Sequence, residues 1–492
     1  MAVSPSRQPA LMWFRDDLRL ADNPALVAAC AGERPVVLLY ILDDVSPGVR
    51  PLGAAARWWL HHSLASLSAS LEKRGNRLVL RRGRAAKIIP EVATAAGATR
   101  IFWNRRYGTA GELDTKIARA LTRKGIAVET HKASLLHEPD EIANRAGKPF
   151  QVYSAFWRTA LADGAPRPPL PAPKKIPATR TKIETDTLAS LGLLPKAPDW
   201  SAGVGAAWTP GEPAATSQLN AFVEKRLSGY ATRRDEPGAD GSSMLSPHLR
   251  FGEISPFQVW KRVNDSGSPA AKFLSEVGWR EFSYHLLGQF PALADQNIKA
   301  GFDTFPWEEP YADDVWAWRR GRTGFPIVDA GMRQLWQTGW MHNRVRMIVA
   351  SFLTKHLLVD WRIGEEWFWD SLVDADPASN PSNWQWVAGS GADAQPYFRI
   401  FNPVLQGEKF DPDGTYVRKF IPEIAALPDR FIHKPWTATD RALASAGIDL
   451  GKTYPWPMVD HKAARTRALE AFSQMRRQSA KTEPERSHTA AD

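Results

Sequence analysis

Short apolar runs alternate with amphipathic helical patterns over the first 131 residues, and no other feature restricts the fold of this chain as strongly. The apolar runs lie at residues 10–14, 36–42, 78–80, 101–103 and 126–128, and the helical patterns at 24–31, 54–73, 85–96 and 112–124. Strands that alternate with helices in this way form a parallel sheet with right-handed crossovers. We therefore predict a Rossmann-like α/β domain with a parallel five-stranded sheet over residues 8–135.

The first strand lacks the signature of a dinucleotide site. Ligands of such sheets bind beyond the carboxyl ends of the strands, where a Gly-x-Gly-x-x-Gly turn usually holds the pyrophosphate. Here the strand ends in Trp13-Phe14-Arg15-Asp16-Asp17 instead. A dinucleotide bound in the usual way is not expected at this position.

The rest of the chain predicts an all-α domain after a long connector. Residues 136–217 have no regular pattern, and the proline-rich stretch 166–177 resists regular structure. From residue 218 to 478 the apolar spacing is helical, and Ser246-Pro247 and Ser255-Pro256 each place a capping serine before a proline at the first helical position. The polar residues 479–492 are expected to form a disordered tail.

Charge and cysteine content limit the setting. The formal net charge of +10 is typical of a protein with a polyanionic partner, although a generically basic protein would carry it too. The single cysteine, Cys30, excludes a disulfide framework and fits a reducing compartment. No apolar run reaches the roughly 18 residues of a membrane span, and the first residues show no signal-peptide pattern. We expect a monomeric cytoplasmic protein.

Ten of the 21 tryptophans lie between Trp307 and Trp386. Each buried indole N–H needs an acceptor, so this concentration indicates a cofactor or an aromatic ligand, with a tryptophan-rich helical core as the simpler alternative. Residues 340–358 add a helical pattern in which Asn343, Arg344 and Met347 share a face away from the apolar stripe. That face suits a flat, partly polar ligand, although a surface helix could carry the same residues.

Two further segments carry clustered polar groups. Residues 241–243 precede a helix start at Ser246, where hydroxyls and backbone N–H groups can bind an anion or simply cap the helix. Asp374 and Asp376 are paired carboxylates on a short loop. No histidine or further carboxylate clusters with them locally, so a metal site is not expected there.

Three motifs in fixed order resemble the DNA photolyase/cryptochrome family. They are Trp-Met-His-Asn-Arg-Val-Arg-Met at 340–347, Asp-Ala-Asp…Asn…Trp-Gln-Trp at 374–386, and Asn-Pro-Val-Leu-Gln-Gly-Glu-Lys-Phe-Asp at 402–411. The likeness extends over residues 10–475 and is strongest to bacterial cyclobutane pyrimidine dimer photolyases of class I or class III. It implies an antenna-binding α/β domain and a helical domain that binds FAD and DNA.

The resemblance implies FAD as the cofactor. By resemblance its contacts are Tyr230, Ser242, Ser243, Met244, Leu245, Ser246, Phe273, Arg280, Asn343, Arg346, Asp374, Ala375, Asp376 and Asn380. Asp374 is expected to pair with Arg346, and Asp376 to contact the flavin or its ribose. Asn380 is expected opposite flavin N5, where plant cryptochromes carry an aspartate, so this amide favours a photolyase over a photoreceptor. Ser242 replaces the family's threonine and keeps its hydroxyl.

The resemblance also implies a lesion site and an electron relay. The lesion or DNA contacts are Arg234, Glu276, Trp279, Asn343, Arg344, Met347, Trp386 and Gln406, and the relay is Trp384, Trp361 and Trp307, with Trp336 as a second candidate terminus. The implied function is light-driven repair of cyclobutane pyrimidine dimers in DNA, by electron transfer from photoexcited reduced FAD to the flipped dimer. Glu276 and Asn380 would take part in catalysis. The alternatives are a cryptochrome-like blue-light photoreceptor that signals to a protein partner and a light-independent flavin oxidoreductase.

The first domain gives hints about an antenna chromophore. Residues 54–63 resemble class III members, and residues 111–112 read Gly-Glu where the enterobacterial folate site has Asn-Glu. Methenyltetrahydrofolate held in a different way is the first expectation. A deazaflavin or FMN is the second, and the absence of any antenna is the remaining alternative. His61 and His62 are expected to be surface histidines of a helix and not ligands.

Overall fold

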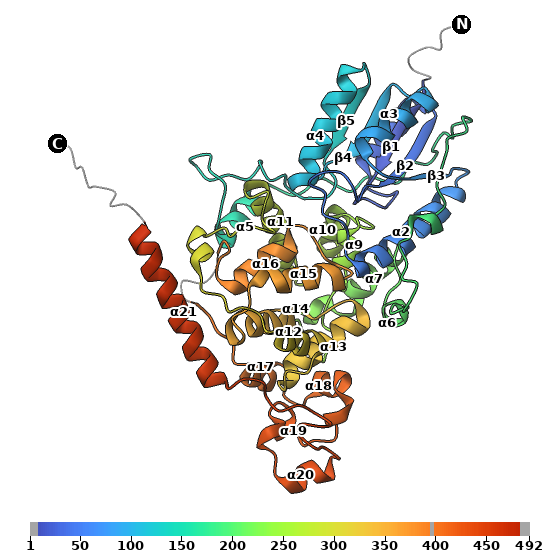
Figure 1. Ribbon diagram of the computed structural model, residues 1–492. Helices are drawn as coiled ribbons and strands as arrows, with labels where there is room; N and C mark the ends of the chain where they lie inside the picture. The colour runs from blue at the N-terminus through green and yellow to red at the C-terminus, as the bar shows by residue number, and fades with distance from the viewer. Residues whose placement is uncertain (1–7, 394–397, 483–492) are drawn as a thin grey trace, which may run out of the picture. The chain divides into compact units, whose positions relative to one another are not determined.

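The computed structural model describes residues 8–393 and 398–482, and the chain forms two compact units. Unit 1 comprises Met1–Thr232, Ser242–Ala292 and Trp369–Ser379. Unit 2 comprises Arg233–Gly241, Leu293–Phe368 and Asn380–Asp492. Each unit therefore combines segments that are far apart in the sequence, which Figure 1 colours by residue number.

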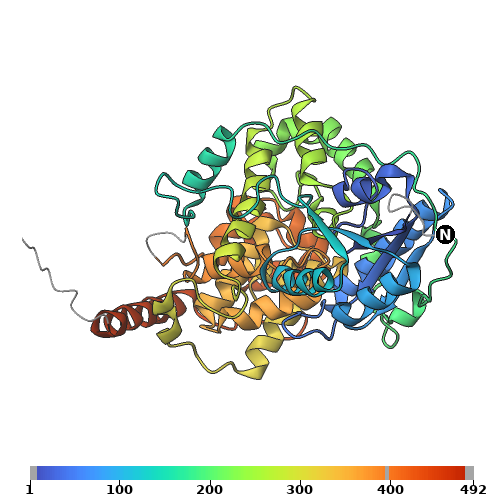
Figure 2. The ribbon, with the colours of Figure 1, turned by 90° about the horizontal axis from the view of Figure 1, so that it is seen from above.

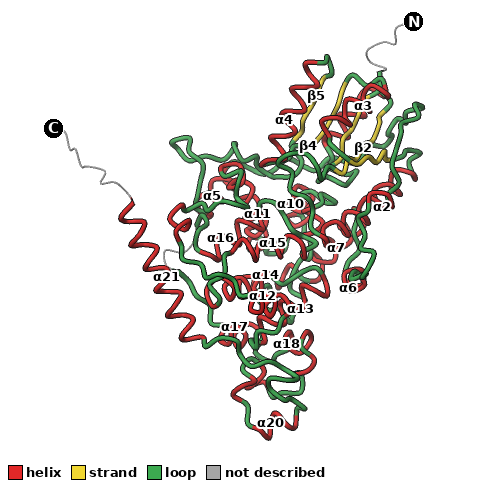
Figure 3. The backbone as a smooth tube through the Cα atoms, viewed as in Figure 1, coloured by secondary structure: helices red, strands yellow, loops and turns green. Residues whose placement is uncertain are grey.

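Unit 1 is built around a five-stranded sheet in the order β3-β2-β1-β4-β5, in which all neighbouring strands are parallel. The strands are β1 (Ala10–Phe14), β2 (Val36–Leu42), β3 (Leu78–Arg82), β4 (Arg100–Asn104) and β5 (Ala127–His131). Every residue of β1 and β2 is buried, which accounts for their uninterrupted apolar runs. The predicted parallel sheet is confirmed, and Figure 3 shows it in yellow.

Helices connect successive strands of this sheet. They are α1 (Pro24–Cys30), α2 (Ala54–Glu72), α3 (Ala85–Ala96) and α4 (Gly108–Arg123). Ile89 and Val92 of α3 and Ile117 of α4 share one hydrophobic cluster with Leu39 and Ile101 of the sheet. These apolar faces explain the helical spacing in the sequence, and Figure 2 shows the blue strands running side by side among the helices that follow them.

A buried polar network surrounds the carboxyl ends of β1 and β4. Asp17 accepts hydrogen bonds from the Arg15 N–H at 2.6 Å and from Asn104 Nδ2 at 2.5 Å. Arg15 also forms an ion pair with Asp114 at 3.2 Å. All four residues are buried, so side chains of the protein itself occupy the polar positions that follow these strands.

The chain after β5 contributes further helices and the predicted connector. The helices are α5 (Tyr153–Ala162), α6 (Ala202–Ala207), α7 (Glu212–Lys225), α8 (Tyr230–Arg233), α9 (Ser246–Arg250), α10 (Pro256–Asn264) and α11 (Ala271–Gln289). The proline-rich stretch is tied to the sheet, because the Val36 N–H donates to the Pro177 carbonyl at 2.8 Å. Ser255 caps α10 through a capping box with Gln258, as the sequence predicted.

Unit 2 is helical. Its helices, two of which extend into segments of unit 1, are α12 (Ala312–Arg320), α13 (Pro326–Thr338), α14 (Asn343–Ser351), α15 (Trp361–Ser371), α16 (Ser379–Ala388), α17 (Pro403–Phe410), α18 (Thr415–Phe420), α19 (Asp429–Ile432), α20 (Asp440–Ser445) and α21 (His461–Thr482). Within the described part of residues 218–482 there is no strand of the kind found in unit 1. The predicted all-α second region is confirmed.

The helix predicted over residues 340–358 is wrong in its extent. α14 starts one residue after His342, which is the N-cap and accepts the Arg344 N–H on Nδ1 at 3.2 Å. The chain then continues as a π-helix over Phe352–His356. Apolar spacing cannot reveal either change, because a cap and a wider turn leave buried residues at nearly the same intervals.

The last helix runs beyond the predicted boundary at residue 478. α21 reaches Thr482, and residues 483–492 of the predicted tail lie outside the described residues. The start of α21 is held by a 2.9 Å contact between His461 Nδ1 and His356 Nε2. None of the helices in the described ranges combines the length and apolar character that crossing a membrane requires.

Candidate functional site

The serine loop predicted as an anion site lies in unit 1. The Ser243 carbonyl accepts a hydrogen bond from Gln218 Nε2 at 2.8 Å, and Met244 has a φ of 57°, a strained value for a residue other than glycine. The prediction that Ser246 caps the helix is wrong. Ser246 is the first residue of α9, and Leu245 occupies the cap position without a side-chain hydrogen bond. Capping therefore does not explain the serines of this loop.

The predicted flavin contacts Tyr230 and Phe273 are neighbours. Their ring centroids lie 5.3 Å apart at 89°, and Phe222 packs against Phe273 at 4.6 Å. Both predicted contacts are at least nine-tenths buried and belong to one hydrophobic cluster. They therefore stabilise the fold of unit 1.

The acidic loop of unit 1 is held from both sides. Asp376 Oδ1 accepts the N–H groups of Ala378 and Ser379 at 2.9 and 2.7 Å, and Oδ2 accepts the Tyr284 hydroxyl at 2.7 Å. The Ala375 carbonyl accepts Arg250 Nε at 2.7 Å. Among the described residues no group of three or more His, Cys, Asp or Glu side chains is arranged to bind a metal. The loop is thus a rigid, hydrogen-bonded segment.

Arg280 lies in a buried polar group on α11 that the sequence analysis did not recognise. Its Nη1 donates to the Ser134 carbonyl at 2.8 Å and to Glu281 at 3.2 Å, and its guanidinium lies 4.9 Å from the centroid of Tyr284. Burial raises the pKa of Glu281 to about 7. The i, i+4 spacing of Arg280 and Tyr284 was the available signal, since both face the same side of one helix.

Glu276 and Trp279, the predicted lesion contacts of unit 1, lie on α11 with partial exposure. The Glu276 side chain is 25% exposed and forms an ion pair with Lys272 at 3.2 Å. Trp279 stacks on Tyr153 with centroids 3.8 Å apart and planes at 12°. Tyr153 comes from α5, inside the predicted connector, so sequence spacing gave no reason to connect it with this site.

Asn380 of unit 2 is oriented by its contact with α15. Its Nδ2 donates to the carbonyl and to Oε1 of Glu365, at 3.0 and 2.8 Å. Since an ionised carboxylate can only accept hydrogen bonds, this contact determines which end of the amide faces Glu365. Asn380 is 8% exposed, and in the part of the chain that the structure describes no donor reaches its Oδ1. A buried amide acceptor is therefore available to a ligand.

The predicted phosphate-binding residues of unit 2 form one cluster. Arg344 pairs with Asp235 at 2.9 Å, and its guanidinium lies 4.5 Å from the centroid of Phe410. Its Nη1 lies 3.9 Å from the Met347 sulfur. Arg234 lies 3.7 Å from Asp235. The sequence analysis missed Asp235, although its position directly after Arg234 in a run of charged residues was a usable signal.

Other predicted rim residues lie on neighbouring elements of unit 2. Asn343 is exposed at the first position of α14, and Gln406 is half-buried on α17. Trp386 donates its indole N–H to the Asp393 carbonyl at 3.2 Å. His342 is buried behind Arg344, and burial lowers its pKa to about 4. The rim thus rests on a neutral imidazole and not on a third cation.

Arg346 is held within its own segment of unit 2. Its Nε donates to the Met341 carbonyl at 2.8 Å, and its guanidinium lies 5.8 Å from the centroid of Trp340. The pairing with Asp374 that the sequence analysis expected would join residues of different units, and it stays a prediction. The contacts with Met341 and Trp340 support the Arg346 side chain.

The predicted relay tryptophans are packed into unit 2. Trp384 and Trp361 are almost completely buried, and Trp361 donates its N–H to Asn297 Oδ1 at 2.9 Å. A Cβ on Gly364, three residues after Trp361, would lie 2.1 Å from the Trp384 ring, so the glycine allows α15 to pack against this indole. The buried Trp318 lies 6.3 Å from Trp384, and it is a neighbour that the prediction left out.

Trp307 and Trp336 differ as candidate outer positions of a relay. Trp307 packs against Phe305 at 4.3 Å and is half-buried. Trp336 is 53% exposed and stacks on Trp367 with centroids 6.4 Å apart and planes at 5°. Both therefore have an aromatic neighbour and access to solvent, and the geometry leaves both available as relay ends.

The residues predicted to mark an antenna region belong to α2. Trp59 is fully buried and donates its N–H to Glu253 at 3.0 Å, while Trp58 is 5% exposed and lies 4.4 Å from His62. His61 and His62 are half-buried on the same helix, and burial lowers the pKa of both imidazoles. The two tryptophans are therefore core residues of unit 1.

Comparisons with known proteins cover nearly the whole chain. Residues 10–174 match a family model described as DNA photolyase, and residues 273–474 match the FAD binding domain of DNA photolyase. A deoxyribodipyrimidine photo-lyase from Agrobacterium fabrum is 50% identical over 96% of this chain and 100% of its own. Cryptochrome-2 from Arabidopsis thaliana is 40% identical over 95% of this chain and 79% of its own.

A solved structure supports the same relationship. The crystal structure of a bacterial class III photolyase from Agrobacterium tumefaciens superimposes with a TM-score of 0.93. The two sequences are 50% identical, and the match covers 97% of this chain and 99% of that one. The similarity therefore extends to both units and to the order of their elements.

Proposed function

Because the chain belongs to the DNA photolyase and cryptochrome family, we propose that it is a deoxyribodipyrimidine photo-lyase that repairs cyclobutane pyrimidine dimers in DNA with light. The chain is more similar to the photo-lyase relative, at 50% identity, than to the cryptochrome relative, at 40% identity. This difference favours a repair enzyme over a cryptochrome photoreceptor. The observation in the structure that carries the proposal is the orientation of Asn380 by Glu365, which holds Nδ2 and leaves Oδ1 as a possible acceptor for a ligand.

The residues present fit FAD. In its reduced form the flavin carries a hydrogen on N5, and the acceptor oxygen of Asn380 suits that donor. An aspartate at this position would place a second carboxylate against Glu365, which costs energy unless one of them binds a proton. Bound reduced FAD would supply both the absorption of light and the electron for repair.

Each unit would make its own contribution to flavin binding. In unit 1 the hydroxyls and N–H groups of residues 242–246 suit the pyrophosphate, and the Asp374–Asp376 segment suits the ribose or the flavin ring. In unit 2 the contributions come from Asn343, Arg346 and Asn380. These roles follow from the family resemblance, and the contacts described above support them by holding each segment in a defined conformation.

The lesion would be bound by two kinds of residue, apolar side chains for the pyrimidine rings and polar side chains for the DNA backbone. Trp279, Met347 and Trp386 offer apolar surfaces for the pyrimidine rings of a flipped dimer. Arg234, Arg344 and Gln406 would contact the DNA backbone beside it. Because Asp235 already pairs with Arg344, phosphate would have to compete with or rearrange that ion pair. DNA affinity should fall steeply as salt increases, because contacts between these arginines and phosphates release counterions from the DNA.

Two groups would act on the reaction itself. Glu276 is half-exposed on α11, and a carboxyl group at the dimer can donate or accept a hydrogen bond at a base edge. Trp384, Trp361 and the outer position at Trp307 or Trp336 would carry electrons from the surface to an oxidised flavin. Their aromatic neighbours support short transfer steps, although the choice between the two ends needs mutagenesis.

The α/β domain of unit 1 is the expected place for an antenna chromophore. We propose methenyltetrahydrofolate in unit 1, with a deazaflavin or FMN as alternatives. Extraction of bound chromophores from the purified protein, followed by mass spectrometry, tests the assignment. Recovery of FAD alone contradicts it. Gel filtration and fractionation of the source cells test the expected monomer and its cytoplasmic location.

The repair proposal is tested with an oligonucleotide that carries a single thymine dimer. The FAD-containing protein is reduced beforehand, and samples are illuminated or kept dark. Restoration of the two thymines in light alone is the expected result. A parallel oligonucleotide with a (6-4) photoproduct should remain unrepaired. Absence of dimer repair with reduced FAD present would contradict the proposal and favour the photoreceptor alternative.

A further inference from the structure

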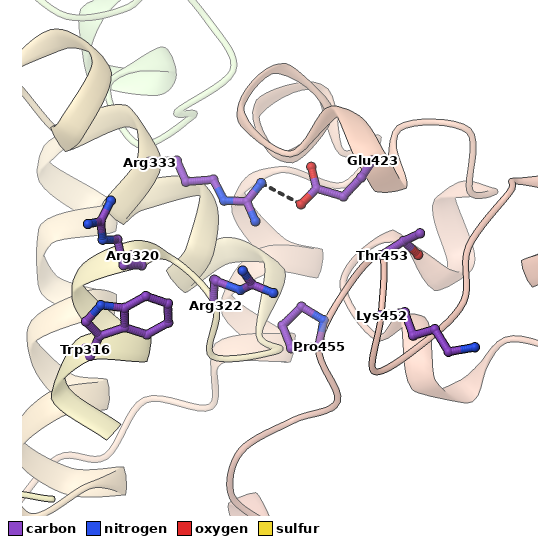
Figure 4. A pocket seen from close by; sticks show the side chains of 8 residues that line it. All are labelled: Trp316, Arg320, Arg322, Arg333, Glu423, Lys452, Thr453 and Pro455. Atoms are coloured by element: carbon purple, nitrogen blue, oxygen red, sulfur yellow. Dashed lines mark ion pairs between the residues drawn. The ribbon is translucent and has the colours of Figure 1, made fainter. Parts of the chain in front are cut away.

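A cavity in unit 2 is lined by basic and aromatic side chains. Its volume is about 460 Å³, which lies within the range of small-molecule sites. Its lining residues, drawn in Figure 4, are Trp316, Arg320, Arg322, Arg333, Glu423, Lys452, Thr453 and Pro455. None of them belongs to the flavin, lesion or relay residues named above, so the repair reaction leaves this cavity without a role.

The charges in this cavity are only partly compensated. Arg333 pairs with Glu423 at 2.7 Å, and Lys452 pairs with Asp449 at 2.6 Å. Within the described residues, the guanidinium groups of Arg320 and Arg322 have neither an ion pair nor a hydrogen-bond acceptor. Two lining cations are thus available to an anion.

The arrangement of the side chains places one of these cations at the centre of the cavity. Figure 4 shows Arg322 between Trp316 and Pro455, whereas the Lys452 ammonium points away from the other side chains. Guanidinium groups match phosphate oxygens with two parallel hydrogen bonds each. The guanidinium of Arg322 can therefore hold a phosphate in this position, and Figure 4 shows the Arg320 guanidinium pointing in another direction.

The aromatic part of the cavity is exposed. Trp316 is 52% exposed, and Trp336, just outside the lining, is 53% exposed. The Arg320 guanidinium lies 5.8 Å from the centroid of Trp316 and 5.7 Å from that of Trp336. An exposed indole beside a cation offers a stacking surface for a flat ring, and this combination is typical of sites that bind nucleotides.

We propose that this cavity binds a nucleoside phosphate, with its base stacked on Trp316, its phosphate held by Arg322, and Arg320 adding positive charge beside the indole. The ligand can be a free nucleotide or one nucleotide of single-stranded DNA, because both present the same base and phosphate. The site is separate from FAD binding, and it would let the protein hold a second nucleotide while the flavin stays in place.

The proposal is tested by photoaffinity labelling of the FAD-containing protein with 8-azido-ATP. Peptide mapping should find the label within residues 312–333 or 449–456, and an excess of ATP should remove it. A hexathymidylate strand is the second competitor. If it removes the label as well, the site accepts single-stranded DNA; if only ATP does so, the ligand is a free nucleotide. Label confined to other peptides overturns the proposal.

Variants separate this site from non-specific labelling. The double variant R320A/R322A should lower labelling at least tenfold, whereas Arg441→Ala, at an exposed arginine of α20, should leave it unchanged. Trp316→Ala should lose the label and Trp316→Phe should keep most of it, because stacking needs a ring. Equal labelling of R320A/R322A and the wild type overturns the proposal.

Repair and folding serve as internal controls. FAD content and light-dependent dimer repair should stay at wild-type values in these variants, since the residues lie outside the repair machinery. Failure of the proposed photo-lyase activity would leave the labelling result intact, so the two proposals fail separately. If the double variant does not fold, Arg322→Glu at its exposed position replaces it, with the same tenfold loss expected.

Discussion

The carboxyl end of β1 and the start of α16 both bury polar side chains, yet they use them differently. After β1, neighbouring residues pair with both oxygens of Asp17 and with the two terminal nitrogens of Arg15. At α16, Glu365 accepts hydrogen bonds from the amide nitrogen of Asn380, and the amide oxygen of Asn380 is available to a ligand. The first arrangement joins side chains of the protein to one another and indicates a structural network, whereas the second leaves an oriented acceptor that a ligand can use.

The largest expected change in the free energy of unfolding comes from the structural network. Asp114 pairs with Arg15 at 3.2 Å and with Arg106 at 2.6 Å, so Asp114→Ala leaves two arginines without their partner. We expect a loss of about 3–5 kcal/mol, measured by urea unfolding followed by circular dichroism. Asp429→Ala, which removes an exposed pair with Arg418, is the control and should cost about 1 kcal/mol or less. Equal effects in both variants would contradict the comparison.

A smaller change in the free energy of unfolding is expected at Glu365, which orients Asn380. Glu365→Gln can donate as well as accept, so it no longer determines the orientation of Asn380. We expect about 1–2 kcal/mol lower stability, from the loss of charge-assisted hydrogen bonds, and a more negative midpoint potential of bound FAD. Unfolding and a spectroscopic redox titration measure the two effects. Glu366→Gln, at the exposed neighbouring position, should change neither. An unchanged potential in Glu365→Gln would remove Asn380 orientation from the proposal.

A third prediction concerns His342, a buried imidazole that caps α14 in its neutral form. The pKa of His342 is lowered to about 4 in the folded protein from an ordinary value of 6.5. Between these two pH values the unfolded chain binds more protons, so the stability contributed by neutral His342 is present above pH 6.5 and is lost as the pH falls through 4. His342→Asn keeps a capping side chain and removes the titration.

The measurement is urea unfolding of both proteins from pH 7 to pH 4. At pH 7 the two should agree within about 1 kcal/mol, and the wild type should lose more stability than the variant on acidification. Parallel pH profiles would show that His342 does not titrate between the folded and unfolded states. The cap would then be as tolerant of charge as an exposed residue.

The smallest change in stability is expected at a polar group that is already solvated. Glu276→Ala removes a partly exposed pair with Lys272, which is worth about 0.5 kcal/mol or less. Repair of the thymine dimer per absorbed photon should nevertheless fall, with FAD content unchanged. Lys272→Ala breaks the same pair and serves as the control. If Lys272→Ala lowers repair as much, or if Glu276→Ala repairs fully, the catalytic role of Glu276 is wrong.

Parts of the site that depend on local spacing were predictable from the sequence. Phe273, Glu276, Trp279 and Arg280 lie three or four residues apart along the chain or next to each other, and α11 carries all of them. Partners from distant segments were not predictable. Nothing local to Trp279 indicates that a tyrosine more than a hundred residues earlier stacks on it, as Tyr153 does.

The sequence by itself determined the parallel sheet of unit 1, the helical character of unit 2 and the family, because periodic burial and ordered motifs are properties of adjacent residues. Only the tertiary structure decided how the polar groups are shared. Glu365 orients Asn380, Asp235 neutralises part of Arg344, and a buried, neutral His342 caps α14. Hydrogen bonds and burial depend on which distant segments come into contact, and the spacing of residues along the chain does not specify those contacts.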